Sequence, residues 1–189
     1  MGQTNYEKIS SAQGPCFYPG GHLWHYRFIY QLFQWTDNAE YILIALHFAL
    51  YSATIALISK LSYQYFKQDV MQAQMVSFML VSNCFVRLLQ EMCFNDSILA
   101  FYLVASIYQM TNQRPLTSAL LAGLSFSIKA GSILIVPGLL GWTHYQYGPI
   151  VLAKSILLIG FLHFAMALPF VSVWGSRLYA WSVNPNLVF

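Results

Sequence analysis

Residues 41–59 read YILIALHFALYSATIALIS and contain no charged side chain. An α-helix needs about 20 predominantly apolar residues to cross the hydrocarbon core of a bilayer. The stretch has that length, and Lys60 and Lys67 follow it directly. It therefore predicts a transmembrane helix and assigns the chain to the membrane proteins.

The composition of the whole chain agrees with this class. Of the 189 residues, 58% are hydrophobic and only 8% are charged, and the mean hydropathy is +0.53. Soluble domains carry about 25% charged residues. The net charge of +3 is small and scattered, which argues against nucleic-acid binding. We expect a single membrane domain, residues 1–189, dissolved in the lipid bilayer.

Further apolar stretches extend from residue 71 to residue 174. They cover residues 71–89, 97–111, 116–142 and 150–174, the last kinked or ended near Pro169. A polar tail, residues 175–189, follows them. The sequence thus predicts an all-α, multi-pass transmembrane protein with about five spans between residues 41 and 174.

The stretch 116–142 has two interpretations. It forms either one long span with Lys129 near its middle or two half-length helices that meet at residues 129–131. Small residues crowd its first half, and Ala119 to Gly123 has the small-xxx-small spacing that allows helices to pack closely. A close helix contact is therefore expected there with either interpretation.

Residues 1–40 precede the spans and contain an unusual segment at 14–26, which reads GPCFYPGGHLWHY. Its prolines fix φ, and Gly20 and Gly21 permit positive φ. This predicts a shaped loop, neither helix nor strand, followed by an interfacial helix over residues 22–35 that is rich in aromatic rings. The loop is either an ordinary turn or a rigid wall of a binding cleft.

The short connections predict the orientation of the spans. Residues 60–70 and 112–115 carry Lys or Arg without a negative excess, which favours the cytoplasmic side by the positive-inside rule. With a single span over 116–142, residues 14–26, 91–96 and 143–149 then meet on the opposite face. That face is the expected location of a binding site.

Asp96 and Lys129 are the two ionisable candidates for this site. Asp96 is either a helix cap or a carboxylate that holds sugar hydroxyls. A lysine inside a span is costly unless it serves a site, and it suits a phosphate ligand as a point charge. The alternative for Lys129 is that its side chain reaches the membrane interface.

The histidines do not suggest a metal site, because they lack the spacing of metal ligands. His47 and His163 fall inside spans, where we expect them to be packed or hydrogen-bonded. His22 and His25 lie in the Gly/Pro segment and are better placed to contact a substrate. The sequence indicates no cofactor.

Four parts of the chain resemble motifs of one enzyme family. They are Tyr6-Glu7-Lys8-Ile9 with Gly14-Pro15 and Tyr18-Pro19-Gly20-Gly21-His22, then Phe94-Asn95-Asp96, then Ser127-Ile128-Lys129 with Pro137-Gly138-Leu139-Leu140, and finally Trp181-Ser182-Val183-Asn184. In order and spacing they resemble the dolichyl-phosphate-mannose-dependent α-1,3-mannosyltransferases of N-glycan assembly.

The resemblance implies a GT-C fold in the endoplasmic reticulum membrane and a metal-independent reaction. Mannose would move from dolichyl phosphate mannose to the lumenal dolichyl-diphosphate oligosaccharide that carries five mannoses and two N-acetylglucosamines. The substrate-binding residues carried over from the motifs are Tyr18, Pro19, Gly21, His22, Asn95, Asp96 and Lys129.

The chain also departs from the family pattern. Gly20 replaces an alanine, the Arg87 to Phe94 stretch is longer, and the family keeps a first span and an acidic lumenal stretch ahead of the motif that begins here at Tyr6. The catalytic base is therefore expected upstream of this chain, which corresponds to a central part of the enzyme with a partial GT-C fold. The alternative is a non-enzymatic membrane scaffold, accessory subunit or small transporter.

Overall fold

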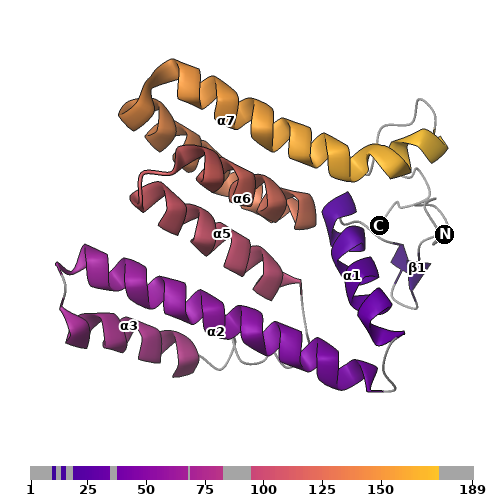
Figure 1. Ribbon diagram of the computed structural model, residues 1–189, viewed down its shortest axis with the longest axis horizontal. Coiled ribbons are helices and arrows are strands. Elements are labelled where there is room, and N and C mark those ends of the chain that lie inside the picture. Colours follow the sequence, from indigo (N-terminus) through magenta and orange to yellow (C-terminus); the bar gives the residue numbers. More distant parts are fainter. Residues whose placement is uncertain are drawn as a thin grey trace.

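A computed structural model describes residues 10–11, 14–15, 19–34, 38–67, 69–82 and 95–174. Two short strands pair antiparallel, and all other elements are helices (Figure 1). The elements are β1 (Ser10–Ser11), β2 (Gly14–Pro15), α1 (Gly20–Phe33), α2 (Ala39–Tyr65), α3 (Val70–Ser82), α5 (Asp96–Thr111), α6 (Pro115–Ile128), the 3-10 helix η2 (Ala130–Leu134) and α7 (Val136–Trp174). Apart from the strand pair, the prediction of an all-α protein is confirmed.

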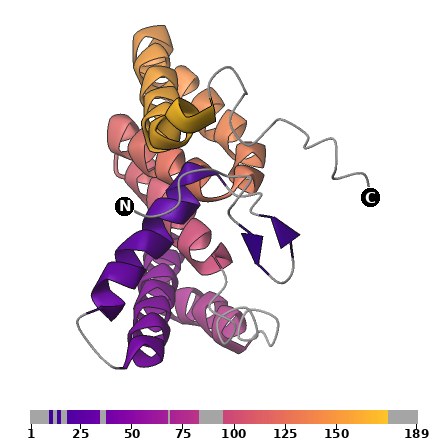
Figure 2. The ribbon, with the colours of Figure 1, turned by 90° about the vertical axis from the view of Figure 1, so that its right-hand side faces the viewer.

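The long helices form a bundle with two distinct ends. α5 packs against α6 and α2, α6 packs against α7, and α2 packs against α3. α1 lies across one end of this bundle, where it contacts α6 and α7 (Figures 1 and 2). We call this the α1 end. The opposite end, which contains the turn after α2 and the turn between α5 and α6, is called the Lys60 end.

Two described helices are long and apolar enough to cross a membrane. They are Tyr41–Tyr65 and Val136–Pro169, and the most apolar 18 residues of each have mean hydropathies of 2.0 and 2.1. α5 and α6 are apolar but have only 16 and 14 residues. The predicted span over residues 71–89 corresponds to α3 as far as Ser82, and its remainder lies outside the described residues.

The stretch 116–142 forms a hairpin, so its interpretation as one span is wrong. α6 ends at Ile128, and Lys129 has extended backbone angles (φ −149°, ψ 129°) that no helix can continue. η2 then turns the chain back into α7. Pro137 is tolerated in the first turn of α7, because the backbone donors there have no partner within the helix.

α7 contains a second reversal at Gly148. This residue has φ 78° and ψ 180°, a conformation that is open to glycine and strained for other residues. It divides α7 into a first arm over residues 136–147 and a second arm over 149–174. The second arm matches the last predicted span, but the chain breaks at Gly148, and the helix continues past Pro169.

The hairpin corrects the predicted location of residues 143–149. Trp142 lies beside Leu61 and Thr111 at the Lys60 end, whereas the indole Nε1 of Trp24 on α1 donates to the carbonyl of Met166, 3.1 Å away. Residues 143–149 therefore lie at the Lys60 end, opposite the α1 end. The prediction that they join residues 14–26 is wrong, because it assumed a single span over 116–142.

The prediction that residues 14–26 form neither helix nor strand is also wrong. Gly14–Pro15 pairs with β1, and α1 begins at Gly20, two residues before the predicted interfacial helix. Pro19 is the N-cap residue, with φ −59°, so its missing N–H falls where no intrahelical bond is needed. Gly20 and Gly21 are helical and do not supply the expected positive φ.

The packing of α6 shows why its small residues matter. Ala119 and Ala122 are buried together with Leu139 and Ile159 of α7. A Cβ added at Gly123 would lie 3.3 Å from the Cα of Ile159 and 3.0 Å from a methyl of Leu162. The predicted close helix contact is confirmed.

Hydrogen bonds add to this contact on the other side of α6. The Ser106 hydroxyl of α5 donates to the Ser118 carbonyl at 2.8 Å, and the Ser125 hydroxyl donates to the Leu99 carbonyl at 3.3 Å. Hydroxyl-to-carbonyl bonds of this kind hold helices together where lipid offers no competing partner. α6 is therefore fixed against both α5 and α7.

Replacement of Gly123 by leucine should lower the free energy of unfolding by about 1–3 kcal/mol, the usual cost of overpacking a close contact. Gly160→Leu is the matched control, because nothing lies within 4 Å of a Cβ at Gly160 and the gain in helix propensity is the same. Thermal unfolding of both variants in detergent micelles measures the difference. Equal melting temperatures would contradict the packing argument.

Candidate functional site

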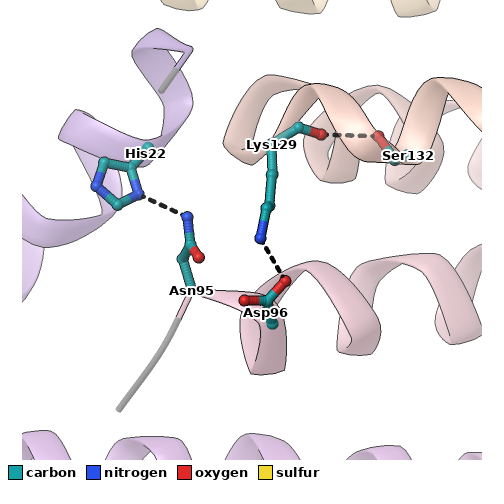
Figure 3. A network of polar contacts seen from close by, with 5 residues as sticks. All are labelled: His22, Asn95, Asp96, Lys129 and Ser132. Atoms are coloured by element: carbon teal, nitrogen blue, oxygen red, sulfur yellow. Dashed lines mark hydrogen bonds and ion pairs between the residues drawn. The ribbon is translucent and has the colours of Figure 1, made fainter. Parts of the chain in front are cut away.

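Three segments that are distant in sequence meet at the α1 end. They are the start of α1, the start of α5 and the junction between α6 and η2, and Figure 3 shows the side chains that they bring together. Five predicted site residues gather here: Gly21, His22, Asn95, Asp96 and Lys129. Pro19 is buried at the N-cap of α1, and Tyr18 lies outside the described residues.

An ion pair joins Lys129 to Asp96. The lysine Nζ is 2.6 Å from the Asp96 Oδ1, and the two side chains are 35% and 31% exposed. Pairs with this exposure are stabilised only weakly, because water screens both charges. The pair is therefore accessible, and a stronger anion could replace the carboxylate as the partner of Lys129.

The surroundings of the two charges distinguish between the alternatives that the sequence left open. Lys129 lies at a helix junction rather than in the middle of a span, and it is paired. Asp96 is the first residue of α5, and the N-cap residue is Asn95, whose side chain makes no capping hydrogen bond. A carboxylate in the first turn still interacts favourably with the helix dipole, so Asp96 has two partners of positive sign.

Asn95 connects the ion pair to α1. Its side chain is only 2% exposed, and its Nδ2 donates to Nδ1 of His22 at 3.3 Å (Figure 3). Its Oδ1 is buried and has no hydrogen-bond partner within the described part of the chain. A buried carbonyl oxygen without a partner is costly, which suits a group that accepts a hydrogen bond from a ligand or water.

Burial keeps His22 neutral. Burial, together with the smaller effects of the nearby His25 and Lys129, lowers the pKa of His22 from 6.5 to about 4. Because Asn95 donates to Nδ1, the ring proton of the neutral imidazole lies on Nε2. Burial, followed by the charge of His47, also lowers the pKa of His25. The site thus combines one cation, one carboxylate and neutral imidazoles.

Gly21 allows α1 to approach this junction. A Cβ at Gly21 would lie 2.7 Å from the Ser127 carbonyl oxygen and 2.8 Å from its carbon. These are backbone atoms, two residues before Lys129, so they cannot rotate away. The absent side chain, and not a positive φ, explains why the site needs a glycine here.

His47 is the neighbour whose place in the site the sequence did not reveal. Its side chain is 1% exposed, and its Nδ1 lies 2.7 Å from the Ser97 Oγ, next to Asp96. The expectation that His47 is packed and hydrogen-bonded is confirmed. Its proximity to the site depends on how α2 packs against α5, which no spacing in the sequence encodes.

The site offers no metal centre. In residues 19–34, 38–67, 69–82 and 95–174, no group of three or more His, Cys, Asp or Glu side chains could hold a metal ion. What the arrangement can do is bind an anion through Lys129 and bind hydroxyl groups through Asp96, Asn95 and the imidazoles.

Gly21→Ala should destabilise the protein, although alanine in a helix normally gains about 0.5–1 kcal/mol over glycine. The reason is the contact with the Ser127 backbone, which would push α1 away from α6. Gly141→Ala is the control, since nothing lies within 4 Å of a Cβ there. Thermal unfolding in micelles should give melting temperatures that change in opposite directions. A higher melting temperature in both variants would contradict the close contact between Gly21 and the Ser127 backbone.

His22 should titrate with a midpoint near pH 4 in the folded protein. Since the unfolded chain binds the proton at 6.5, the contribution of His22 to stability is complete above pH 6.5 and is lost as the pH falls toward 4. Asn95→Asp should raise the midpoint, because a carboxylate would then face Nδ1. NMR titration of the imidazole measures both, with Asn112→Asp at the Lys60 end as a control that leaves the midpoint unchanged.

Comparisons with known proteins agree in one family. The family model described as ALG3 protein matches residues 1–184. A probable Dol-P-Man:Man(5)GlcNAc(2)-PP-Dol α-1,3-mannosyltransferase of Dictyostelium discoideum is 25% identical over 97% of this chain and 50% of its own length. The enzyme of that name from Cryptococcus neoformans is 26% identical over 89% of this chain and 39% of its own.

These matches define the family but not the whole enzyme. The chain spans about half the length of the curated relatives or less, and no solved structure matches it significantly. The family model covers nearly all of the chain and includes each segment that forms the site. The chain therefore belongs to the ALG3 protein family.

Proposed function

We propose that the chain forms part of an α-1,3-mannosyltransferase that transfers mannose from dolichyl phosphate mannose to a dolichyl-diphosphate oligosaccharide in the endoplasmic reticulum membrane. The observation that carries the proposal is the meeting of three family motif segments, through His22, Asn95–Asp96 and Lys129, at one end of the bundle. The names of the relatives supply the donor and the acceptor.

In this reaction the acceptor hydroxyl oxygen forms a bond to C1 of mannose, and the bond from C1 to the phosphate oxygen breaks. Negative charge develops on the departing dolichyl phosphate. A cation beside that phosphate oxygen stabilises it more strongly as negative charge builds up on the oxygen. The cation therefore stabilises the transition state more than it stabilises the bound donor. Lys129 supplies this cation, and the hydroxyl proton passes to a general base.

Asp96, Asn95 and His22 bind the sugars in this proposal. Asp96 accepts hydrogen bonds from hydroxyls and holds the Lys129 ammonium in place until the donor phosphate arrives. The buried Oδ1 of Asn95 accepts, and the Nε2–H of neutral His22 donates. The uncharged Asn95 and His22 thus lie next to the charged Asp96 and Lys129. This combination suits a ligand with both hydroxyl and phosphate groups.

The distribution of charge supports a lumenal position for this site. Lys60, Lys67 and Arg114 lie in or beside the turns of the Lys60 end, and Lys154 lies in the first two turns of the second arm of α7. The positive-inside rule assigns that end to the cytoplasm. The α1 end then faces the lumen, where the oligosaccharide acceptor is expected. Family membership does not favour the alternative of a non-enzymatic scaffold.

Lys129→Met should weaken binding of dolichyl phosphate mannose about ten- to a hundredfold, since a hydrogen bond to a charged group is worth about 1.5–3 kcal/mol. Asp96→Asn should weaken donor binding less, because the amide oxygen still accepts hydrogen bonds from hydroxyls but no longer holds the Lys129 ammonium by charge. Donor titration of the purified chain measures both. Lys154→Met, an exposed lysine at the other end of the bundle, is the control.

The double variant Lys129→Met/Asp96→Asn separates phosphate binding from a purely structural ion pair. Restored donor affinity would show that only charge balance matters and would contradict the assignment of Lys129. Transfer itself is measured on a chimera in which this chain replaces the matching half of the Dictyostelium relative. The chimera should add mannose to the five-mannose acceptor, and its Lys129→Met variant should not.

A further inference from the structure

An apolar groove lies at the Lys60 end, on the far side of the bundle from the proposed active site. It has a volume of about 710 Å³ and is lined chiefly by Leu61, Phe66, Val76, Ile107 and Trp142. Four helices contribute to it, namely α2, α3, α5 and the first arm of α7. Its volume is within the range of about 300–1,000 Å³ that small-molecule sites occupy.

Two exposed lysines are sequence neighbours of residues that line this groove, although neither belongs to the lining itself. Lys60 directly precedes Leu61, and its Nζ lies 6.0 Å from the centroid of the Tyr108 ring on α5, next to Ile107. Lys67 directly follows Phe66. The neighbouring acid, Asp69, is occupied in part, because its Oδ1 accepts a hydrogen bond from the backbone N–H of Gln72. The exposed charges that neighbour the groove lining in sequence are thus two lysines and one engaged carboxylate.

The backbone at Lys67 is unusual. Its φ is 53°, in the left-handed region that glycine or asparagine adopts readily. For a residue with a Cβ this conformation is unfavourable, because the Cβ approaches the following carbonyl oxygen. Lys67 directly follows the C-cap Phe66 of α2, a position where a left-handed residue commonly ends a helix, and this turn fixes the lysine next to Phe66 of the groove lining.

We propose that this groove binds an anionic phospholipid of the surrounding bilayer, with an acyl chain against the apolar lining and the phosphate head group beside Lys60 and Lys67. A hydrocarbon chain fits an apolar wall in a protein that is surrounded by lipid. The two cations select the charge of the head group, and each basic residue near a membrane surface is worth about 1 kcal/mol toward anionic lipid. Trp142 and Tyr65 provide aromatic rings of the kind found at the depth of the head groups.

The test is quenching of tryptophan fluorescence by brominated lipids, with the whole chain reconstituted into nanodiscs. Brominated phosphatidylserine should quench Trp142 more than brominated phosphatidylcholine does, and the contribution of Trp142 is the difference between the protein and its Trp142→Phe variant. The variant Lys60→Gln/Lys67→Asn removes both charges, while asparagine keeps the left-handed turn at 67.

Removal of each charge should lower the preference for phosphatidylserine about fivefold. Lys154→Gln, an exposed lysine on the second arm of α7 that has no sequence neighbour in the groove lining, should leave it unchanged. Equal quenching of Trp142 by the two lipids would overturn the proposal. So would an equal loss of preference in the Lys154→Gln control. Displacement of the brominated lipid by dolichyl phosphate but not by phosphatidylserine would assign the groove to a polyprenyl phosphate and would also overturn it.

Discussion

The close packing of α6 is the constraint on which the rest of the structure depends. Its small residues bring Ile159 of α7 to one side and the backbone of α5 to another, and its last turn touches Gly21 of α1. Since Lys129 follows that last turn directly, each of these contacts also fixes where the ammonium lies. If α6 shifted by the width of a methyl group, the ammonium of Lys129 would move relative to Asp96.

The sequence predicted the helices well and their path poorly. Apolar composition indicated α2, α5 and α7. Hydropathy does not show, however, whether the chain continues across the membrane at Lys129 or turns back there. That decision depends on the extended backbone at one residue and on Gly148, whose positive φ has no signature beyond the Gly-Pro pair. The misplacement of residues 143–149 follows from this single choice.

The candidate site was predicted in part, because its motif segments retain recognisable residues. Those residues did not reveal that Lys129 is paired with Asp96, or that Gly21 is needed for a backbone contact. Both depend on contacts between residues that are more than 30 positions apart in the sequence, and a local sequence pattern does not indicate such contacts. His47 shows the same limit, since its partner Ser97 is supplied by another helix.

The length of α6 has a consequence for the membrane around it. A helix of 14 residues is about 21 Å long, whereas the hydrocarbon core of a bilayer is about 30 Å thick. Such a hydrophobic mismatch draws the two leaflets together around the helix. In the proposed function, the phosphate of a lipid-linked donor would then meet Lys129 while its lipid tail stays in the bilayer. The short helix would thereby lower the free-energy cost of moving that tail out of the lipid.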